Sequence, residues 1–164
     1  MSAIESVRTL SVRAGALTRR AAFVAPLLAR LTVGVAFAES GWGKVHNLEA
    51  VSGYFAELGI PAPAFQATFV SYVELICGSL VLFGLGTRVA AVPLIGTMVV
   101  ALITAKASDI ASFSDLIGTI ELCYAVLCAW LALAGPGAAS IDHAIARRAS
   151  SPTASSSVLP ASLA

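Results

Sequence analysis

Apolar and polar positions follow one another along the chain in blocks that predict helices. The long apolar stretches lie at residues 26–44, 66–85, 89–105 and 114–134. Each has about the 20 residues that a helix needs to cross a hydrocarbon core of roughly 30 Å. The pattern therefore predicts four membrane-spanning helices.

The segments between these spans predict one further helix and three turns. Within residues 47–59, apolar residues recur at helical steps, which is typical of an amphipathic helix on a membrane surface. Residues 60–64 (IPAPA) and 84–87 (GLGT) predict tight turns, and 106–115 a polar connection. The expected fold is all-α: a four-helix transmembrane bundle with a short amphipathic surface helix between spans one and two.

The first span carries a stripe of residues that sets it apart from an ordinary apolar helix. Steps of three and four place five residues on one face: Arg30, Gly34, Phe37, Gly41 and Lys44. Glycines allow a neighbouring helix to approach closely. An unpaired charge in hydrocarbon costs roughly 3 kcal/mol or more, so this face is expected to pack against other helices.

Composition agrees with a membrane protein. The chain is 58% hydrophobic and only 12% charged, whereas a soluble domain has about 25% charged residues. The net charge of +1 and the lack of a basic cluster with interleaved aromatics exclude a nucleic-acid partner. Cys77, Cys123 and Cys128 form no CxxC pair and are expected to act as small buried hydrophobes.

The ends of the chain differ from its middle. Residues 1–20 are rich in Arg and are interpreted as a basic cytoplasmic tail, with a transit peptide as the alternative. Residues 21–148 form the four-span membrane domain, and 149–164 are low-complexity and expected to be disordered. Residues 36–38 (AFA) resemble a signal-peptidase site, but Arg30 interrupts the preceding apolar run, so an uncleaved helix is expected.

Lys and Arg are distributed unevenly between the two faces of the predicted bundle. One face holds only Lys44 and Lys106. The other holds the tails and the turn between spans two and three, with Arg8, Arg13, Arg19, Arg20, Arg88, Arg147 and Arg148. The positive-inside rule then places both termini in the cytoplasm.

Four charged residues are candidates for an intramembrane polar site: Arg30, Glu39, Glu74 and Glu121. At 1.5 Å per residue, Arg30 lies roughly 12 Å and Glu74 roughly 16 Å from the cytoplasmic end of its span, so these two are expected to pair. Glu121 lies roughly 20 Å in, and Glu39, roughly 25 Å in, is expected to face water or Lys44.

These charges have two interpretations. They form either a buried ion-pair network or a polar pocket, open to the outer side, that handles a proton or binds a small polar head group. Small residues beside the acids, such as Gly78 on the face of Glu74, favour close helix contact. In the second interpretation Glu121 carries a proton, or exchanges one near neutral pH, because its apolar span desolvates it.

Common catalytic signatures are missing from the sequence. The chain has no Walker loop, dinucleotide fingerprint, paired haem histidines or metal-ligand cluster. We therefore expect no metal and no intrinsic cofactor, and the sequence leaves open whether the protein is an enzyme.

The same residues resemble those of a known family. Arg30, Gly34, Phe37, Gly41 and Lys44, followed by Gly59-Ile60-Pro61, Glu74-x3-Gly78 and residues 84–88 (GLGTR), are similar in order to the DoxX family of small four-helix membrane proteins. The resemblance covers about residues 24–135. It implies a multi-pass protein of the bacterial inner membrane. Some members are described as subunits of quinone-linked oxidoreductases acting on sulfur compounds, others as parts of complexes for oxidative-stress defence.

Three functions follow as hypotheses. The first is a membrane subunit or anchor of a redox complex, with a quinone site lined by Arg30, Glu74 and Glu121 and a soluble or membrane redox partner protein. The second is a non-catalytic scaffold that holds a partner at the lipid bilayer. A small transporter is the third and is disfavoured, because the sequence shows no inverted repeat.

Overall fold

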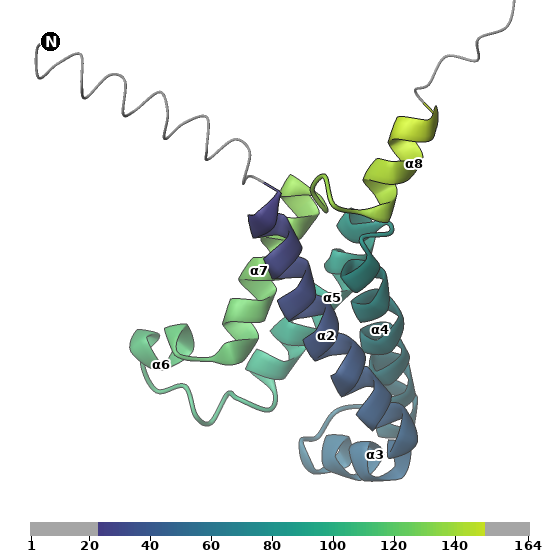
Figure 1. Ribbon diagram of the computed structural model, residues 1–164. Helices are drawn as coiled ribbons and strands as arrows, with labels where there is room; N and C mark the ends of the chain where they lie inside the picture. Colours follow the sequence, from purple (N-terminus) through teal and green to yellow (C-terminus); the bar gives the residue numbers. More distant parts are fainter. Residues whose placement is uncertain (1–22, 150–164) are drawn as a thin grey trace, which may run out of the picture.

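The structure, a computed structural model, describes residues 23–149 and consists of helices and their connections (Figure 1). The helices are α2 (Val24–His46), α3 (Leu48–Glu57), α4 (Pro63–Phe83), α5 (Thr87–Ile103), α6 (Phe113–Ile117), α7 (Ile120–Ala134) and α8 (Ile141–Ala149). No strand occurs within these residues, so the all-α prediction is confirmed for them.

The first three predicted spans and the surface helix all correspond to observed helices. Their bounds differ from the prediction by at most three residues. α2 and α4 are long and apolar enough to cross a membrane, whereas α5 and α7 are apolar but shorter, with 17 and 15 residues. α3 lies at one end of the bundle, and α8 and the start of α2 lie at the other (Figure 1).

The predicted fourth span, 114–134, is not one continuous helix. It is divided into α6 and α7 by Gly118 and Thr119. Thr119 has an extended backbone, and its hydroxyl accepts a hydrogen bond from the Leu122 N–H, so it caps the start of α7. α6 has its own capping box, formed by Ser112 and Asp115. Two complete N-terminal caps within eight residues explain why the helix restarts.

The C-terminal part also departs from the prediction. α8 was not expected; it begins after Ser140, whose Oγ accepts a hydrogen bond from the His143 N–H. Ala149 ends this helix. The predicted tail 1–20 lies outside the described residues, as does the predicted disordered tail 149–164 except for its first residue, Ala149, which is helical and not disordered.

Small residues set the contact between α2 and α4. A Cβ atom added at Gly34 would lie 2.6 Å from the Cα of Leu82, and one at Gly78 would lie 2.6 Å from the Ala38 nitrogen. An added Cβ at Gly41 would collide with the backbone of Leu75. The residues of α4 in contact with α2 have lower numbers as the numbers along α2 rise, so the two helices are antiparallel. Their backbones touch, as the glycine stripe predicted.

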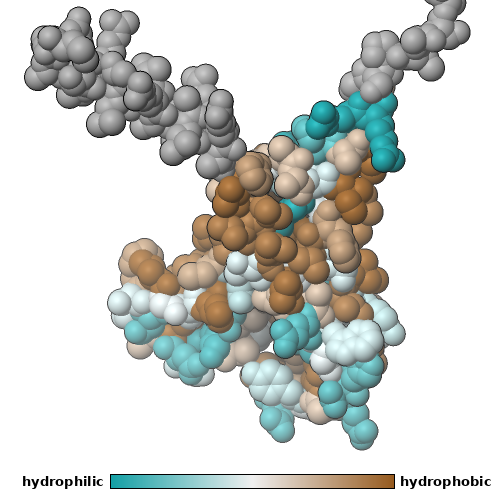
Figure 2. Space-filling view, in the orientation of Figure 1, coloured by the Kyte–Doolittle hydropathy of each residue, from teal (hydrophilic) through white to brown (hydrophobic). Residues whose placement is uncertain are grey.

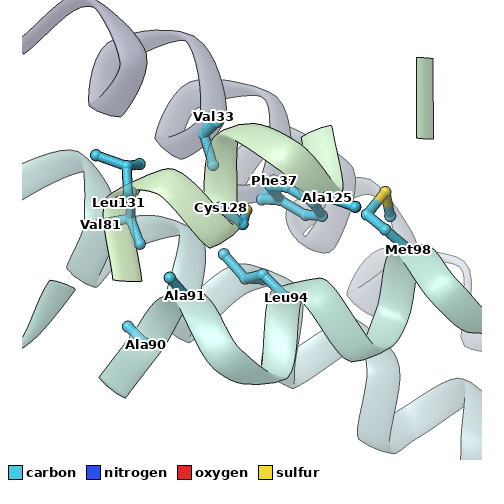
Figure 3. Packing of buried hydrophobic residues seen from close by; sticks show 10 residues of the cluster. All are labelled: Val33, Phe37, Val81, Ala90, Ala91, Leu94, Met98, Ala125, Cys128 and Leu131. Atoms are coloured by element: carbon cyan, nitrogen blue, oxygen red, sulfur yellow. The ribbon is translucent and has the colours of Figure 1, made fainter. Parts of the chain in front are cut away.

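The buried apolar core lies where α2, α5 and α7 meet, with one residue from α4 (Figure 3). α5 supplies four of its side chains and α7 three. The members are Val33, Phe37, Val81, Ala90, Ala91, Leu94, Met98, Ala125, Cys128 and Leu131. Arg30, Ser71, Glu74 and Thr87 are the buried polar residues of the described chain.

Large apolar side chains also cover the outside of the bundle. In Figure 2 the middle of the visible face is mostly hydrophobic, and hydrophilic residues gather toward its two ends. Exposed examples come from four different helices: Leu28, Ile76, Val89 and Leu133. A soluble monomer rarely exposes so much contiguous apolar surface, which fits contact with lipid.

Candidate functional site

Glu74 lies in the middle of α4, is 2% exposed, and is held by two side chains of α2. Lys44 Nζ lies 2.6 Å from Glu74 Oε2, and Ser40 Oγ donates a 2.8 Å hydrogen bond to the same oxygen. Ser40 and Lys44 are four residues apart and therefore lie on one face of α2. The result is an ion pair between a buried carboxylate and a partly exposed ammonium, with a charge-assisted hydroxyl contact.

The predicted pairing of Arg30 with Glu74 is wrong. Arg30 is 2% exposed, and its Nη2 donates a 2.5 Å hydrogen bond to the carbonyl oxygen of Ala139. An added Cβ at Gly84, the C-cap residue of α4, would collide with Nη1 of Arg30. The glycine contacts therefore fix a register in which Arg30 lies beside the end of α4 and not beside Glu74.

Arg30 ties three segments together at this end of the bundle. The Asp142 carboxylate, on α8, acts electrostatically on it and accepts a 2.9 Å hydrogen bond from the Gly86 N–H. A cation is also favoured near the negative end of a helix, here α4. Nε and Nη1 of Arg30 have no hydrogen-bond partner in the described structure. This arrangement joins α2, the α4–α5 turn and α8.

A cavity of about 840 Å³ lies between α2, α3, α4, α5 and α7. Apolar side chains form most of its wall, among them Val51, Phe55, Phe69, Val73 and Met98. Ser40, Lys44 and Glu74 form a polar group in the wall, and Glu121 belongs to the same lining. A largely apolar cavity with a few converging polar groups is the usual form of a small-molecule site.

Glu121 lies in the first turn of α7 and is half-buried. Within residues 23–149 its carboxylate makes no hydrogen bond and no ion pair. The break at Gly118 and Thr119 places Glu121 at a helix N-terminus and not in the middle of a span. The helix dipole favours an acidic side chain at that position.

Glu39 lies outside the large cavity. It is exposed and lines a shallow, open depression of the surface next to that cavity. Ser40, Lys44 and Tyr124 line both the cavity and the depression, whereas Glu74 lines the cavity alone.

The structure thus brings only part of the predicted polar site together. Glu74 and Glu121 share one cavity, Glu39 is next to it, and Arg30 is elsewhere. The predicted packing residues Gly34, Phe37, Gly41 and Gly78 are buried. Ser40 was missed as a partner of Glu74, although its spacing from Lys44 was a readable signal.

Apolar outer surfaces on an all-helical bundle, with charges hidden between helices, define an integral membrane protein. The family model for DoxX matches residues 25–107, half of the chain. The chain therefore belongs to the DoxX family, as the sequence pattern predicted.

Three curated proteins illustrate the relationship. The chain is 37% identical over 131 residues to an uncharacterized membrane protein of Mycobacterium tuberculosis, covering 73% of this chain and 80% of that protein. It is 36% identical over 83 residues to CatD of Bacillus subtilis, named as a proposed oxidoreductase, covering 51% and 60%. It is 27% identical over 125 residues to the inner membrane protein YqjF of Escherichia coli, covering 76% and 95%. No solved structure matches the chain.

Proposed function

We propose that this protein is a four-span inner-membrane protein, with both termini in the cytoplasm, that serves as the membrane subunit or anchor of a quinone-linked redox complex. The observation that carries the proposal is the apolar cavity with the Lys44–Glu74 pair and Glu121 in its wall. The name of CatD and the inner-membrane location in the name of YqjF agree with it.

The residues present fit a quinone. A volume of about 840 Å³ is within the roughly 300–1,000 Å³ that holds drug-sized ligands, and the apolar wall suits an isoprenoid tail. The quinone would supply two-electron transfer. Lys44 keeps N–H groups beyond the one directed at Glu74 and can hydrogen-bond a head-group oxygen, while Glu121 can accept a proton.

A partner protein is part of the proposal. No group of three or more His, Cys, Asp or Glu side chains within residues 23–149 could hold a metal ion. Electrons would therefore come from or go to a redox centre on another subunit. The scaffold hypothesis shares this partner but needs no ligand in the cavity.

The test fills the cavity. Gly96 lines it, and an added Cβ there meets nothing within 4 Å, so the Phe side chain of Gly96→Phe starts in open space at the cavity wall. Gly53→Phe on α3 is the matched control, since Gly53 is equally open and does not line the cavity. We expect decylubiquinone to bind the unaltered protein and Gly53→Phe in nanodiscs, and Gly96→Phe to lose at least tenfold in affinity.

Absence of decylubiquinone binding to the unaltered protein would reject the quinone site. Affinity purification in mild detergent then separates the remaining hypotheses. A co-purifying redox enzyme without bound quinone would favour the scaffold function, and a co-purifying enzyme with quinone would agree with the proposal.

A further inference from the structure

The charged groups of the large cavity do not balance. Its lining contains one cation, Lys44, and two carboxylates, Glu74 and Glu121. Lys44 and Glu74 are 2.6 Å apart and neutralise each other. Glu121 has no such partner among residues 23–149, so the formal charge of the lining is −1.

Three of the five hydroxyls in the lining, all except those of Tyr54 and Tyr124, already donate to protein acceptors. Ser40 Oγ donates to Glu74, Thr97 Oγ1 to the Leu94 carbonyl at 2.9 Å, and Thr104 Oγ1 to the Val100 carbonyl at 2.7 Å. The Glu121 oxygens are hydrogen-bond acceptors that receive no donor from residues 23–149. A ligand that enters this space meets the Glu121 carboxyl as an unused acceptor, and the donors left to it are the Tyr54 and Tyr124 hydroxyls and the remaining N–H groups of Lys44.

We propose that the cavity selects amphiphiles whose head group carries a hydrogen-bond donor, such as a phenolic hydroxyl, over the same molecule with acceptors only, and that it excludes anionic heads. Glu121 accepts the hydrogen bond, and the tail lies along the apolar wall. This rests on the proposed function and extends it, because it names the reduced, hydroxyl-bearing form of a quinone as the preferred ligand.

Donor preference has a physical basis. A hydrogen bond donated to a carboxylate raises affinity roughly tenfold or more over the same head group without the donor. A carboxylate head brought to Glu121 would place two like charges in a largely apolar space, which disfavours binding.

Matched probes that undergo no redox chemistry provide the test. 4-Nonylphenol and 4-nonylanisole differ only in replacing O–H by O–CH₃, and decanoate supplies an anionic head. Each is measured against the protein in zwitterionic nanodiscs, with empty nanodiscs used to subtract lipid partitioning. We expect 4-nonylphenol to bind at least about tenfold more tightly than 4-nonylanisole, and decanoate more weakly than either.

Variants assign the preference to one residue. Glu121→Met removes the acceptor at similar length and should bring the two affinities together, and Glu121→Gln, which keeps a weaker neutral acceptor, should reduce the preference several-fold. Glu57→Met on α3 changes an exposed glutamate outside the cavity lining and should leave the preference for 4-nonylphenol unchanged. If Glu121→Met fails to fold, Glu121→Gln alone decides.

The outcomes also separate this inference from the proposed function. Equal affinity of the unaltered protein for both neutral probes, or a preference that survives both Glu121 variants, overturns the inference. If Gly96→Phe then abolishes binding of both probes, the cavity is still a ligand site and the proposed function stands. If neither the probes nor decylubiquinone binds, both the inference and the proposed function are rejected.

Discussion

Glu74 is buried, and its two donors come from a single turn of α2. Lys44 is 30% exposed, whereas Glu74 is 2% exposed, so the charge that remains after removal of one partner is buried in one case and partly exposed in the other. A lone Glu74 would be a nearly enclosed charge, whereas a lone Lys44 can extend its flexible stem toward water. The pair should therefore respond asymmetrically to substitution.

We predict that Lys44→Met lowers the free energy of unfolding by about 3 kcal/mol and Glu74→Gln by only about 1 kcal/mol. The double variant should lose clearly less than the sum, because the uncompensated carboxylate is gone. Denaturant-induced unfolding in detergent micelles measures the cycle. Arg30→Met combined with Glu74→Gln is the control, and these two losses should add, since the register separates the residues by about ten positions of α4, or roughly 15 Å. Strong coupling of Arg30 with Glu74 would contradict the structure.

Among the elements, the helices with a clear pattern could be predicted, and those defined by local caps were missed. Residues 26–44 and 66–85 are long and mostly apolar, and both are helices within three residues of the expected ends. The break at Gly118 and Thr119 was hidden because the apolar pattern continues through it. Its signal was the spacing of Ser112 to Asp115 and the isolated Thr119, a capping pattern that acts over four residues.

The candidate site was predictable in composition but not in pairing. The sequence singles out Glu74 and Glu121, and both line one cavity. Counting residues from the helix ends suggested that Arg30 and Glu74 lie at similar depth. Tight contacts at Gly34, Gly41 and Gly78 set the actual offset between α2 and α4. Such an offset depends on which backbones touch, and a single sequence does not reveal it.

Asp115 offers a test of α6 as an independent element outside the apolar spans. Hydrogen bonds from the Ser112 hydroxyl, and from the backbone N–H groups of Ser112 and Ala111, hold the pKa of Asp115 below its usual value. A carboxyl with a lowered pKa stabilises the fold above its unfolded pKa of about 3.9, and this contribution is lost as the pH falls through the lower native value.

We therefore predict that α6 loosens on acidification below about pH 4. Backbone chemical shifts of residues 113–117, followed by NMR in micelles between pH 6 and 2, should move toward random-coil values. Asp115→Asn should show loosened α6 already at pH 6 and little further change. Asp109→Asn, in the preceding turn, is the control and should behave like the unaltered protein. An α6 that stays helical in Asp115→Asn would reject the capping explanation.

For the molecule as a whole, the charged residues are distributed unevenly between the two ends of the bundle. The start of α2 and α8 lie at one end of the bundle, and α3 lies at the other (Figure 1). Arg88, in the first turn of α5, and Arg147, on α8, belong to the first end, and Lys44, in the last turn of α2, belongs to the second. By the positive-inside rule, this distribution favours the proposed orientation, with the Arg-bearing end in the cytoplasm.

The number of crossings is a separate question, because α5 and α7 are only 17 and 15 residues long. At 1.5 Å per residue they span roughly 26 and 23 Å, slightly less than a hydrocarbon core of about 30 Å. Such a mismatch costs fractions of a kcal/mol per Å and is accommodated by local thinning of the bilayer. Two crossings by α2 and α4 alone would also return the chain to the cytoplasm, so a reporter at Ser140 alone does not distinguish the two topologies.

The decisive position is Ser108, between α5 and α6. We predict that reporter fusions at Asn47 and Ser108 report the periplasm, and fusions at Leu85 and Ser140 the cytoplasm, because each of the four apolar helices reverses the side. Alkaline phosphatase and green fluorescent protein fusions at the same four sites serve as mutual controls, since the first is active only outside and the second fluoresces only inside. A cytoplasmic Ser108 with a periplasmic Asn47 would mean that only α2 and α4 cross. That topology would contradict the packing in which the end of α5 and the start of α7 line one cavity with α3, on the side of Asn47. A periplasmic Ser108 supports an enclosure by four spans, in which a lipid-soluble ligand can reach Glu121 from the bilayer.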